Sequence, residues 1–346
     1  MSFRLRFTHS LIFQFFLWVL SFFYGINIIM EKKIYGCVLG GWCGDAAGAT
    51  LEFCYKTITN NMVDTAIKMP GGGAIGVGPG QITDDSELEI AILNGLVKSK
   101  TFKNKPSEYP LEFVAEEYIY WINSNPFDVG TTCSNAFLGA FNSQDIIHNA
   151  LKLKAHSQAN GALMRAAIIG VWARNCSDDK IIEFGKLDAQ LSHCNEICQE
   201  VNGLYCLIIA HIINSIPFTK ILDTISKRIT NGEIREWFNQ ANSLANIDCK
   251  KNIGHCKHGF MLVIYFLHNP TPYVDAIKTT LLKGGDTDTN AKIVGSVIGA
   301  MCGVDEIPDY MLVPVINFDC VNTKIGHIRP KKYNVEKAIK LISKII

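Results

Sequence analysis

The stretch that decides the fold and the chemistry of this chain is Lys283-Gly284-Gly285-Asp286-Thr287-Asp288-Thr289-Asn290. Two carboxylates stand two residues apart, each is followed by a hydroxyl, and an apolar helical pattern begins directly afterwards. This order predicts acids at the N-terminus of a helix, where unpaired N–H groups and the positive end of the helix dipole partly compensate their charge. A bound divalent cation compensates such charge far better. The question for the rest of the chain is whether other acids complete such a site.

The composition allows a large core and gives no electrostatic reason to expect nucleic-acid binding. The 346 residues include 33 Lys and Arg against 32 Asp and Glu, a net charge of +1, and 48% of the chain is hydrophobic. A balanced charge does not attract a polyanion. The 12 cysteines show no framework spacing, which indicates reduced thiols in a reducing compartment. We therefore expect a cytoplasmic protein.

The first thirty residues differ from the rest. Residues 11–29 form a largely apolar run after Arg4 and Arg6, and the length of the run is borderline for crossing a bilayer. No small-residue cleavage site follows it, and Met30 offers a second start of translation. Residues 1–30 are therefore either an uncleaved membrane anchor on a cytosol-facing protein or a dispensable extension. The domain proper spans residues 31–346.

Glycine recurs every four residues in two stretches, at Gly36, Gly40, Gly44 and Gly48 and again at Gly295, Gly299 and Gly303. Residues four apart share one helix face, so each stretch predicts a helix with a groove of bare backbone. Each glycine costs a helix up to about 1 kcal/mol relative to alanine, and close packing of the two helices would offset that cost. Such packing would bring together Asp45, Glu52, Asp286 and Asp288. Alternatively, Asp45 is a satisfied polar residue of a buried helix.

A second acid cluster follows a loop. Residues 70–80 are too rich in glycine for any other structure, and they lack the Gly-Lys-Ser/Thr ending of a phosphate-binding loop. Thr83-Asp84-Asp85 then opens an apolar helical pattern, with Thr83 placed as its N-cap. The cluster is either an ordinary helix start or the counterpart of the acids at Asp286 and Asp288.

Helical spacing accounts for most of the remaining chain. It recurs over residues 111–121, 146–153, 197–213 and 334–346, without internal repeats and with almost no alternating strand pattern. This predicts an all-α fold in one compact multi-helix domain. The small residues of the turn at 159–165 suit an anionic ligand, and Arg165 could add charge; the turn and its arginine can equally be plain surface structure. His193 precedes a helix. It is a capping residue, a core residue or a residue that contacts the ligand.

Four motifs in this order resemble the ADP-ribosylglycohydrolase family, and the resemblance runs from about Ile34 to the C-terminus. The motifs are Gly44-Asp45-Ala46-Ala47-Gly48 with Glu52, Thr83-Asp84-Asp85, Asn160-Gly161-Ala162-Leu163-Met164-Arg165, and Gly285-Asp286-Thr287-Asp288-Thr289. Each is weak alone, but four in order are specific. The resemblance implies a single orthogonal bundle of helices that holds two divalent cations, Mg²⁺ or Mn²⁺.

By this resemblance, the chain removes ADP-ribose from a modified amino-acid side chain or a related small ADP-ribosyl compound. The family's metal ligands carry over onto Thr83, Asp84, Asp85, Asp286, Asp288 and Thr289. Its catalytic acids and bases carry over onto Glu52, Asp85 and Asp128, and its substrate contacts onto Asn160, Gly161, Arg165, His193 and His255. Carboxylates and hydroxyls without nearby thiolates or imidazoles independently suit hard, oxygen-preferring ions.

The chain departs from the family pattern at three positions, and two rival functions stay open. Ala159 stands where serine or glycine is frequent, Ile168 where proline is common, and His255 where a tyrosine is frequent. These departures concern the fit around the ADP-ribose and the leaving group. One rival is a non-catalytic ADP-ribose-binding or structural relative, and the other is a two-metal phosphohydrolase that cleaves the pyrophosphate.

Overall fold

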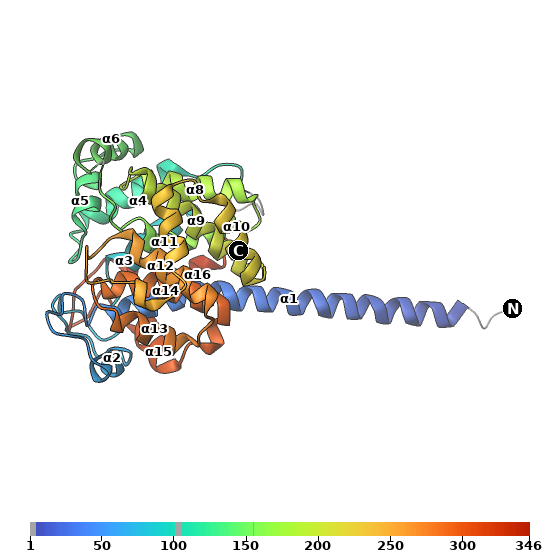
Figure 1. Ribbon diagram of the computed structural model, residues 1–346. Helices are drawn as coiled ribbons and strands as arrows, with labels where there is room; N and C mark the ends of the chain where they lie inside the picture. Colours follow the sequence, from blue (N-terminus) through green and yellow to red (C-terminus); the bar gives the residue numbers. More distant parts are fainter. Residues whose placement is uncertain (1–4, 101–105, 155) are drawn as a thin grey trace.

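The computed structural model describes residues 5–100, 106–154 and 156–346, with side chains described from residue 27 onward except those of residues 153 and 154. This part of the chain contains sixteen α-helices, four short 3₁₀ turns and no β-strand (Figure 1). The predicted all-α fold is confirmed. The helices are α1 (Leu5–Gly48), α2 (Asn60–Ala66), α3 (Asp84–Ser99), α4 (Leu111–Asn123), α5 (Thr131–Phe137), α6 (Ser143–Lys154), α7 (Ala167–Ala173), α8 (Asp178–Gln190), α9 (Glu196–Ile213), α10 (Phe218–Arg228), α11 (Gly232–Gln240), α12 (Cys256–His268), α13 (Tyr273–Leu282), α14 (Thr287–Cys302), α15 (Asp309–Asn317) and α16 (Val335–Ile342).

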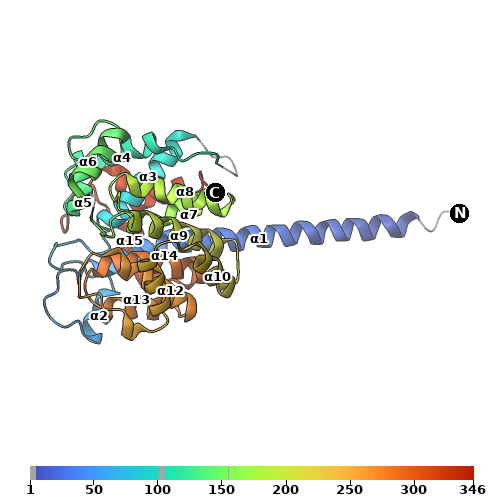
Figure 2. The same ribbon diagram turned by 45° about the horizontal axis from the view of Figure 1, so that its top comes forward.

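The two glycine-faced helices pack directly against each other at the centre of the fold. A Cβ atom built on Gly36 would lie 2.2 Å from the carbonyl oxygen of Gly299, and one built on Gly299 would lie 1.9 Å from that of Gly36. Any side chain at these positions would force α1 and α14 apart. In Figures 1 and 2, α14 lies along the C-terminal part of α1, with the other helices around them. The predicted close approach of the two glycine faces is confirmed.

Helix α1 extends well beyond this contact, because its N-terminal part projects from the other helices (Figures 1 and 2). The predicted anchor or extension at 1–30 falls mostly on side chains outside the described residues. Among the described residues, α9 is long and apolar enough to cross a membrane. However, α9 is a buried core helix, with Leu207, Ile208 and Ile209 fully covered by its neighbours.

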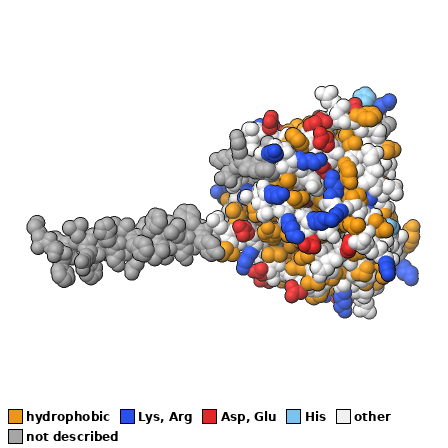
Figure 3. Space-filling model, turned by 180° about the vertical axis from the view of Figure 1, so that it is seen from behind, with side chains coloured by type: hydrophobic (Ala, Val, Ile, Leu, Met, Phe, Trp, Pro, Cys, Tyr) orange, Lys and Arg blue, Asp and Glu red, His pale blue; other side chains and the backbone are white. Residues whose placement is uncertain are grey.

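The remaining helices follow the predicted spacing and cover the central pair. Residues 111–121 lie in α4, 146–153 in α6, 197–213 in α9, and the tail forms α16. Figure 3 shows one face of the molecule, on which basic and acidic side chains are interspersed with hydrophobic ones. This mixed surface agrees with the small net charge of the sequence.

Candidate active site

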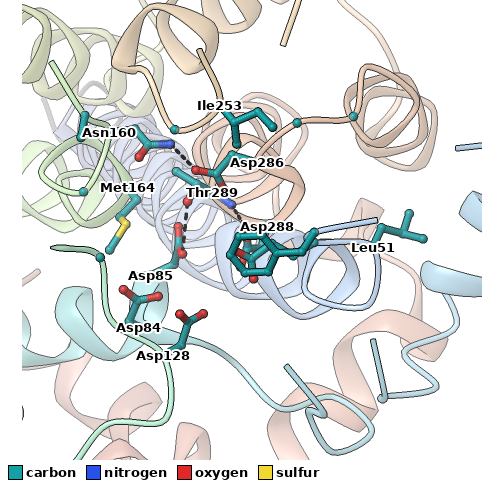
Figure 4. A pocket seen from close by; sticks show the side chains of 18 of the residues that line it. Leu51, Asp84, Asp85, Asp128, Asn160, Met164, Ile253, Asp286, Asp288 and Thr289 are labelled. Carbon is teal, nitrogen blue, oxygen red and sulfur yellow. Dashed lines mark hydrogen bonds between the residues drawn. The ribbon is translucent and has the colours of Figure 1, made fainter. Parts of the chain in front are cut away.

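A pocket of about 810 Å³ opens where the C-terminal end of α1 meets the N-termini of α3 and α14. Its lining includes acids from four segments that are far apart in the sequence, and Figure 4 shows several of them pointing into the same space. The two acid clusters therefore lie on one side of the molecule, as their shared chemistry predicts. The lining acids are Glu52, Asp84, Asp85, Asp128, Asp286 and Asp288.

The turn before α14 aims Asp286 into the pocket. Gly285 has a positive φ of 74°, and a Cβ atom there would lie 1.9 Å from the carbonyl oxygen of Cys249, so only glycine fits. Asp286 occupies the N-cap position of α14, but its side chain makes no capping hydrogen bond. Instead its carboxylate accepts a hydrogen bond from Nδ2 of Asn160, at 2.8 Å. The Asp286 carboxylate is thus held by a residue of another predicted motif.

The glycine contact between α1 and α14 continues into the pocket and sets the position of Glu52. A Cβ atom on Gly48 would lie 2.3 Å from Cα of Asp288, and the Thr287 hydroxyl donates to the carbonyl oxygen of Gly48 at 2.8 Å. Helix α1 therefore ends directly on the first turn of α14. Glu52, Asp128 and Asp288 each place a carboxylate oxygen within 4.8 Å of the others.

The start of α3 supplies the second acid cluster. Thr83 is the N-cap, as predicted, and its hydroxyl accepts a hydrogen bond from the backbone N–H of Asp85. Asp45 is fully buried and accepts hydrogen bonds from the backbone N–H groups of Thr83 and Ser86 and from both hydroxyls. Asp45 is thus a satisfied structural residue behind the pocket. The Thr289 hydroxyl lies 3.3 Å from Oδ2 of Asp85 and joins the two clusters (Figure 4).

Burial, and after it the closeness of the carboxylates to one another, raises their pKa values. Burial, followed by the charges of Asp128 and Asp286, raises the pKa of Glu52 to about 8. Burial is also the main cause that raises the pKa of Asp84, Asp85 and Asp288 well above the ordinary aspartate value, with neighbouring carboxylates adding to it. A site that disfavours its own charged state in this way favours a bound cation.

The donor set fits hard divalent cations. Among the described residues, Oε2 of Glu52 and Oδ1 of Asp85 are buried without any hydrogen-bond partner. A buried carboxylate oxygen without a hydrogen-bond partner lowers the stability of the fold unless a ligand binds it. The groups around them are oxygen donors, which Mg²⁺ and Mn²⁺ prefer over nitrogen or sulfur. Glu52, Asp84, Asp85, Asp128, Asp286, Asp288 and Thr289 are the side chains placed to bind such ions.

Comparison with known proteins identifies the family. The sequence profile of the family described as ADP-ribosylglycohydrolase matches residues 27–332. The chain belongs to the ADP-ribosylglycohydrolase family. It is 28% identical to a protein of Acanthamoeba polyphaga mimivirus that carries a provisional ADP-ribosyl glycohydrolase name, over 84% of this chain and 93% of the viral one. It is 25% identical to the ADP-ribosyl-[dinitrogen reductase] glycohydrolase of Rhodospirillum rubrum, over 81% of this chain and 88% of that protein.

A solved structure shares the fold. The chain resembles a structure titled "ADP-ribosylglycohydrolase-related protein complex" with a TM-score of 0.70 and 18% identity, over 92% of this chain and 99% of the other. This likeness supports the architecture of the ADP-ribosylglycohydrolase domain.

Some of the predicted substrate contacts of this glycohydrolase domain line the pocket and others do not. Asn160, Gly161 and His193 are lining residues. Arg165, which we predicted to contact the substrate, is instead fully buried and paired with Asp188, with Nε 3.0 Å from Oδ2. Arg165 is buried because the one-turn 3₁₀ segment Leu163–Arg165 directs its guanidinium into the core.

His255 and Thr83 also lie behind the pocket lining of the ADP-ribosylglycohydrolase domain. The Nδ1 atom of His255 caps α12 by accepting from the backbone N–H of Lys257, and Nε2 lies 2.8 Å from Oε1 of Gln158. Thr83 is fully buried, and its hydroxyl lies 3.2 Å from Oδ2 of Asp85. Both residues therefore adjoin residues of the pocket wall without forming its surface.

Sequence reasoning missed the buried ion pairs that support the acids. Glu89 on α3 binds Nζ of Lys292 at 2.7 Å and also accepts from Nε1 of Trp42. The backbone N–H of Ile168 donates to Glu89 at 3.1 Å, a bond that proline at this position could not make. The departure at Ile168 therefore adds a hydrogen bond to this ion pair. The signal available in the sequence was Glu87 and Glu89, two charged residues in an otherwise apolar helical stretch, each of which needs a partner when buried.

Proposed function

We propose that this protein hydrolyses the bond between ADP-ribose and an amino-acid side chain, or the equivalent bond of a small ADP-ribosyl compound. The observation that carries the proposal is the convergence of Glu52, Asp84, Asp85, Asp286 and Asp288 on one pocket. Relatives of this chain are named for this type of reaction, including an ADP-ribosylarginine hydrolase, Tri1, of Serratia proteamaculans that is 23% identical over 80% of this chain.

The pocket acids are proposed to bind two divalent cations, Mg²⁺ or Mn²⁺. When bound, these ions supply positive charge that orients the ribose hydroxyls and lowers the pKa of a water molecule. Asp84 and Asp85 approach from α3, and Asp286, Asp288 and Thr289 approach from the start of α14. The side chains that would hold the ions therefore stand on two separate helix N-termini.

The reaction needs one group to move a proton and others to hold the sugar. Hydrolysis at the anomeric carbon passes through an oxocarbenium-like transition state, in which a carboxyl group deprotonates water or protonates the leaving group. Glu52 is the first candidate because its Oε2 has no partner among the described residues. Asp128 and Asp85 are the other candidates. Asn160 and Gly161 line the same pocket, where they would contact the ADP-ribose.

The decisive experiment uses peptides that carry ADP-ribose on arginine or on serine. The protein is incubated with each peptide and Mg²⁺, and the products are separated by chromatography. Free ADP-ribose supports the proposal, whereas AMP would support pyrophosphate cleavage. Binding of ADP-ribose without turnover of either peptide would support a non-catalytic relative.

Two variants test whether the pocket carries the activity. Asp286→Ala removes a carboxylate of the pocket, and Asp223→Ala removes an exposed carboxylate that pairs with Lys227 on the surface of α10. We expect turnover to disappear in the first variant and to be unchanged in the second. Equal activity of Asp286→Ala and the unmodified protein would refute the assignment of Asp286 as a metal ligand.

The proposed location is the reducing cytoplasm. Among the described residues, all of the cysteines have free thiols, as is usual for a reducing compartment. Residues 11–29 can in addition attach the protein to a membrane, since their apolar composition borders on that of a spanning helix. Fractionation of cells that express the chain with and without residues 1–29 distinguishes a tether from a dispensable extension.

A further inference from the structure

One acid of the pocket, Asp128, is carried by a loop rather than by the start of a helix. The other aspartates of the pocket stand at the N-termini of α3 and α14, whereas Asp128 lies in the loop of residues 124–130 between α4 and α5. Its carboxylate lies beside that of Asp84 in Figure 4, with an oxygen within 4.8 Å of oxygens of Glu52 and Asp288. Like charges this close repel each other. Contacts outside the pocket must therefore hold the loop in place.

The guanidinium of Arg329 fastens the first half of this loop. Its Nη1 donates to the carbonyl oxygens of Ser124, at 2.9 Å, and Asn125, at 3.0 Å, and its Nη2 donates to the Ser124 hydroxyl at 2.9 Å. Asn125 has a φ of 56°, a left-handed conformation that residues other than glycine rarely adopt. Arg329 itself is 3% exposed and pairs with Glu87. The loop therefore leaves α4 along a fixed path.

The imidazole of His327 holds the residue next to Asp128. It stacks on the ring of Phe127, with the two centroids 4.0 Å apart and the planes 7° apart. Nε2 of His327 lies 2.7 Å from the carbonyl oxygen of Ile75. A carbonyl oxygen only accepts, so this nitrogen carries a proton and donates it. The imidazole is thus fixed at one edge, and its face limits the movement of Phe127 and of the Asp128 that follows.

The side-chain amide of Gln81 fixes the backbone of His327. Oε1 of Gln81 accepts from the N–H of His327 at 2.9 Å, and Nε2 donates to the carbonyl oxygen of His327 at 2.7 Å. Oε1 also accepts from the N–H of Gly78 at 2.9 Å. Gln81 is 1% exposed and stands three residues before Asp84. These bonds therefore connect the loop of Asp128 to the start of α3.

The glycine-rich loop of residues 70–80 allows this arrangement. A Cβ atom on Gly78 would lie 2.5 Å from the carbonyl oxygen of Ile325, and one on Gly326 would lie 2.3 Å from the backbone nitrogen of Gly78. Only bare backbone on both sides lets the segment that carries His327 pack so closely on the loop. The glycines thus bring Ile75 and Gln81 within hydrogen-bond distance of His327.

We propose that His327 is a positioning residue for the hydrolysis, which holds the Asp128 carboxylate beside Glu52 and Asp288 through its stack on Phe127. Within the described part of the chain, the residues that line the pocket do not include His327. His327 therefore acts on the substrate only through Asp128. This inference rests on the proposed function for its effect on turnover, whereas the hold on the loop does not depend on that function.

The hold on the loop is measured on the full chain without ligand, by amide hydrogen exchange of residues 124–130 and mass spectrometry. We expect His327→Ala to accelerate exchange in this segment several-fold, because the loop opens more often. His327→Phe keeps a stacking ring and should exchange like the unmodified protein. The control is His268→Ala, at an exposed histidine in the last turn of α12, which should change nothing here. Equal exchange in His327→Ala and the unmodified protein overturns the proposal.

The effect on turnover is measured with Mg²⁺ and whichever ADP-ribosylated peptide the unmodified protein hydrolyses. We expect His327→Ala to lower kcat about 10- to 100-fold, since a small displacement of a reacting group can cost about 10²-fold. His327→Phe should recover most of this loss. Asp128→Asn supplies the discriminating background: adding His327→Ala to it should lower kcat no further, because the two changes act through one carboxylate. A loss by the same factor in both backgrounds would indicate a general structural role and overturn the proposal.

The outcomes separate this proposal from the proposed function. If the unmodified protein releases ADP-ribose and His327→Ala turns over as fast as His268→Ala, the positioning role is refuted and the hydrolase survives. If the unmodified protein releases no ADP-ribose, the proposed function fails, and hydrogen exchange alone decides whether His327 holds the loop.

Discussion

Helix α3 carries two pairs of buried acids that differ in one respect. Glu87 and Glu89 have cationic partners, because Glu87 binds Arg329 at 2.8 Å and Glu89 binds Lys292 at 2.7 Å. Asp84 and Asp85, one turn earlier, are almost as deeply buried but have no Lys or Arg partner within the described ranges. The ion pairs tie α3 to other parts of the fold, whereas the unpaired acids remain available to bind a ligand. Four predictions test this contrast.

The largest expected effect is on activity. Asp84→Asn preserves the shape of the side chain and removes its charge, so we expect kcat/KM for an ADP-ribosylated peptide to fall roughly 10²- to 10⁴-fold. The unfolding midpoint of the ion-free protein should stay the same or rise, since the substitution removes the cost of burying a charge, beside Asp128 in particular. Steady-state kinetics and thermal unfolding on the same preparation measure both effects. Retained activity would show that Asp84 is only a well-placed helix-start residue.

The second prediction concerns the paired acids. Glu89→Gln leaves the Lys292 ammonium buried without a counter-charge, and the free energy of unfolding should fall by about 3–5 kcal/mol. Urea denaturation measures this loss, and Glu183→Gln, at an exposed pair with Lys180, is the control and should change little. If Glu89→Gln proved as stable as its control, the distinction between the two pairs of acids would disappear.

The third prediction concerns the proposed divalent cations. Mg²⁺ or Mn²⁺ at a hundred times its dissociation constant should stabilise the protein by about 2.7 kcal/mol for each ion bound. Asp85→Asn should lose most of this gain, because Oδ1 of Asp85 is one of the orphaned oxygens of the pocket. Thermal unfolding with and without the metal salt, with Ca²⁺ as a further comparison, gives the result. A midpoint that does not respond to any of these ions would favour the structural relative over the hydrolase.

The smallest effect is the pH dependence of the ion-free protein. Glu52 has a pKa of about 8 in the folded state, above its ordinary value of 4.5. Between these values the folded protein binds more protons than the unfolded chain, so stability must fall as the pH rises from 5 to 8. We expect a loss on the order of 2 kcal/mol, less than the full shift implies because Glu52 is partly exposed. Denaturation of Glu52→Gln over the same range should show a shallower slope, and saturating Mg²⁺ should flatten it further. An unchanged slope in Glu52→Gln would assign the effect to other acids.

Much of this organisation could be predicted from the sequence, because it depends on short-range patterns. The four-residue glycine spacing predicted the contact of α1 and α14, and Thr83 was readable as an N-cap. Hydroxyls and carboxylates at two helix starts predicted one shared site, and the structure brings them to one pocket.

Other features depend on long-range packing, which has no local signature. The partners of Arg165 and His255 lie 23 and 97 residues away, so their positions behind the pocket wall could not be read from spacing. The same holds for Lys292 and Arg329, whose acids are more than 200 residues distant in the sequence. A basic residue in an apolar helix, such as Lys292 in α14, signals that a partner exists without saying which one.

Helix α1 runs without interruption from Leu5 to Gly48, so the segment that projects from the body and the segment that ends at the pocket are one rod. An α-helix turns by about 100° and rises by about 1.5 Å per residue. Deleting one residue from the projecting part would therefore rotate anything fused in helical phase at Leu5 by that angle, without touching the glycine contact. The length of α1 thus sets the orientation of a rigid fusion partner for imaging, which can be placed at chosen angles around the axis of this helix.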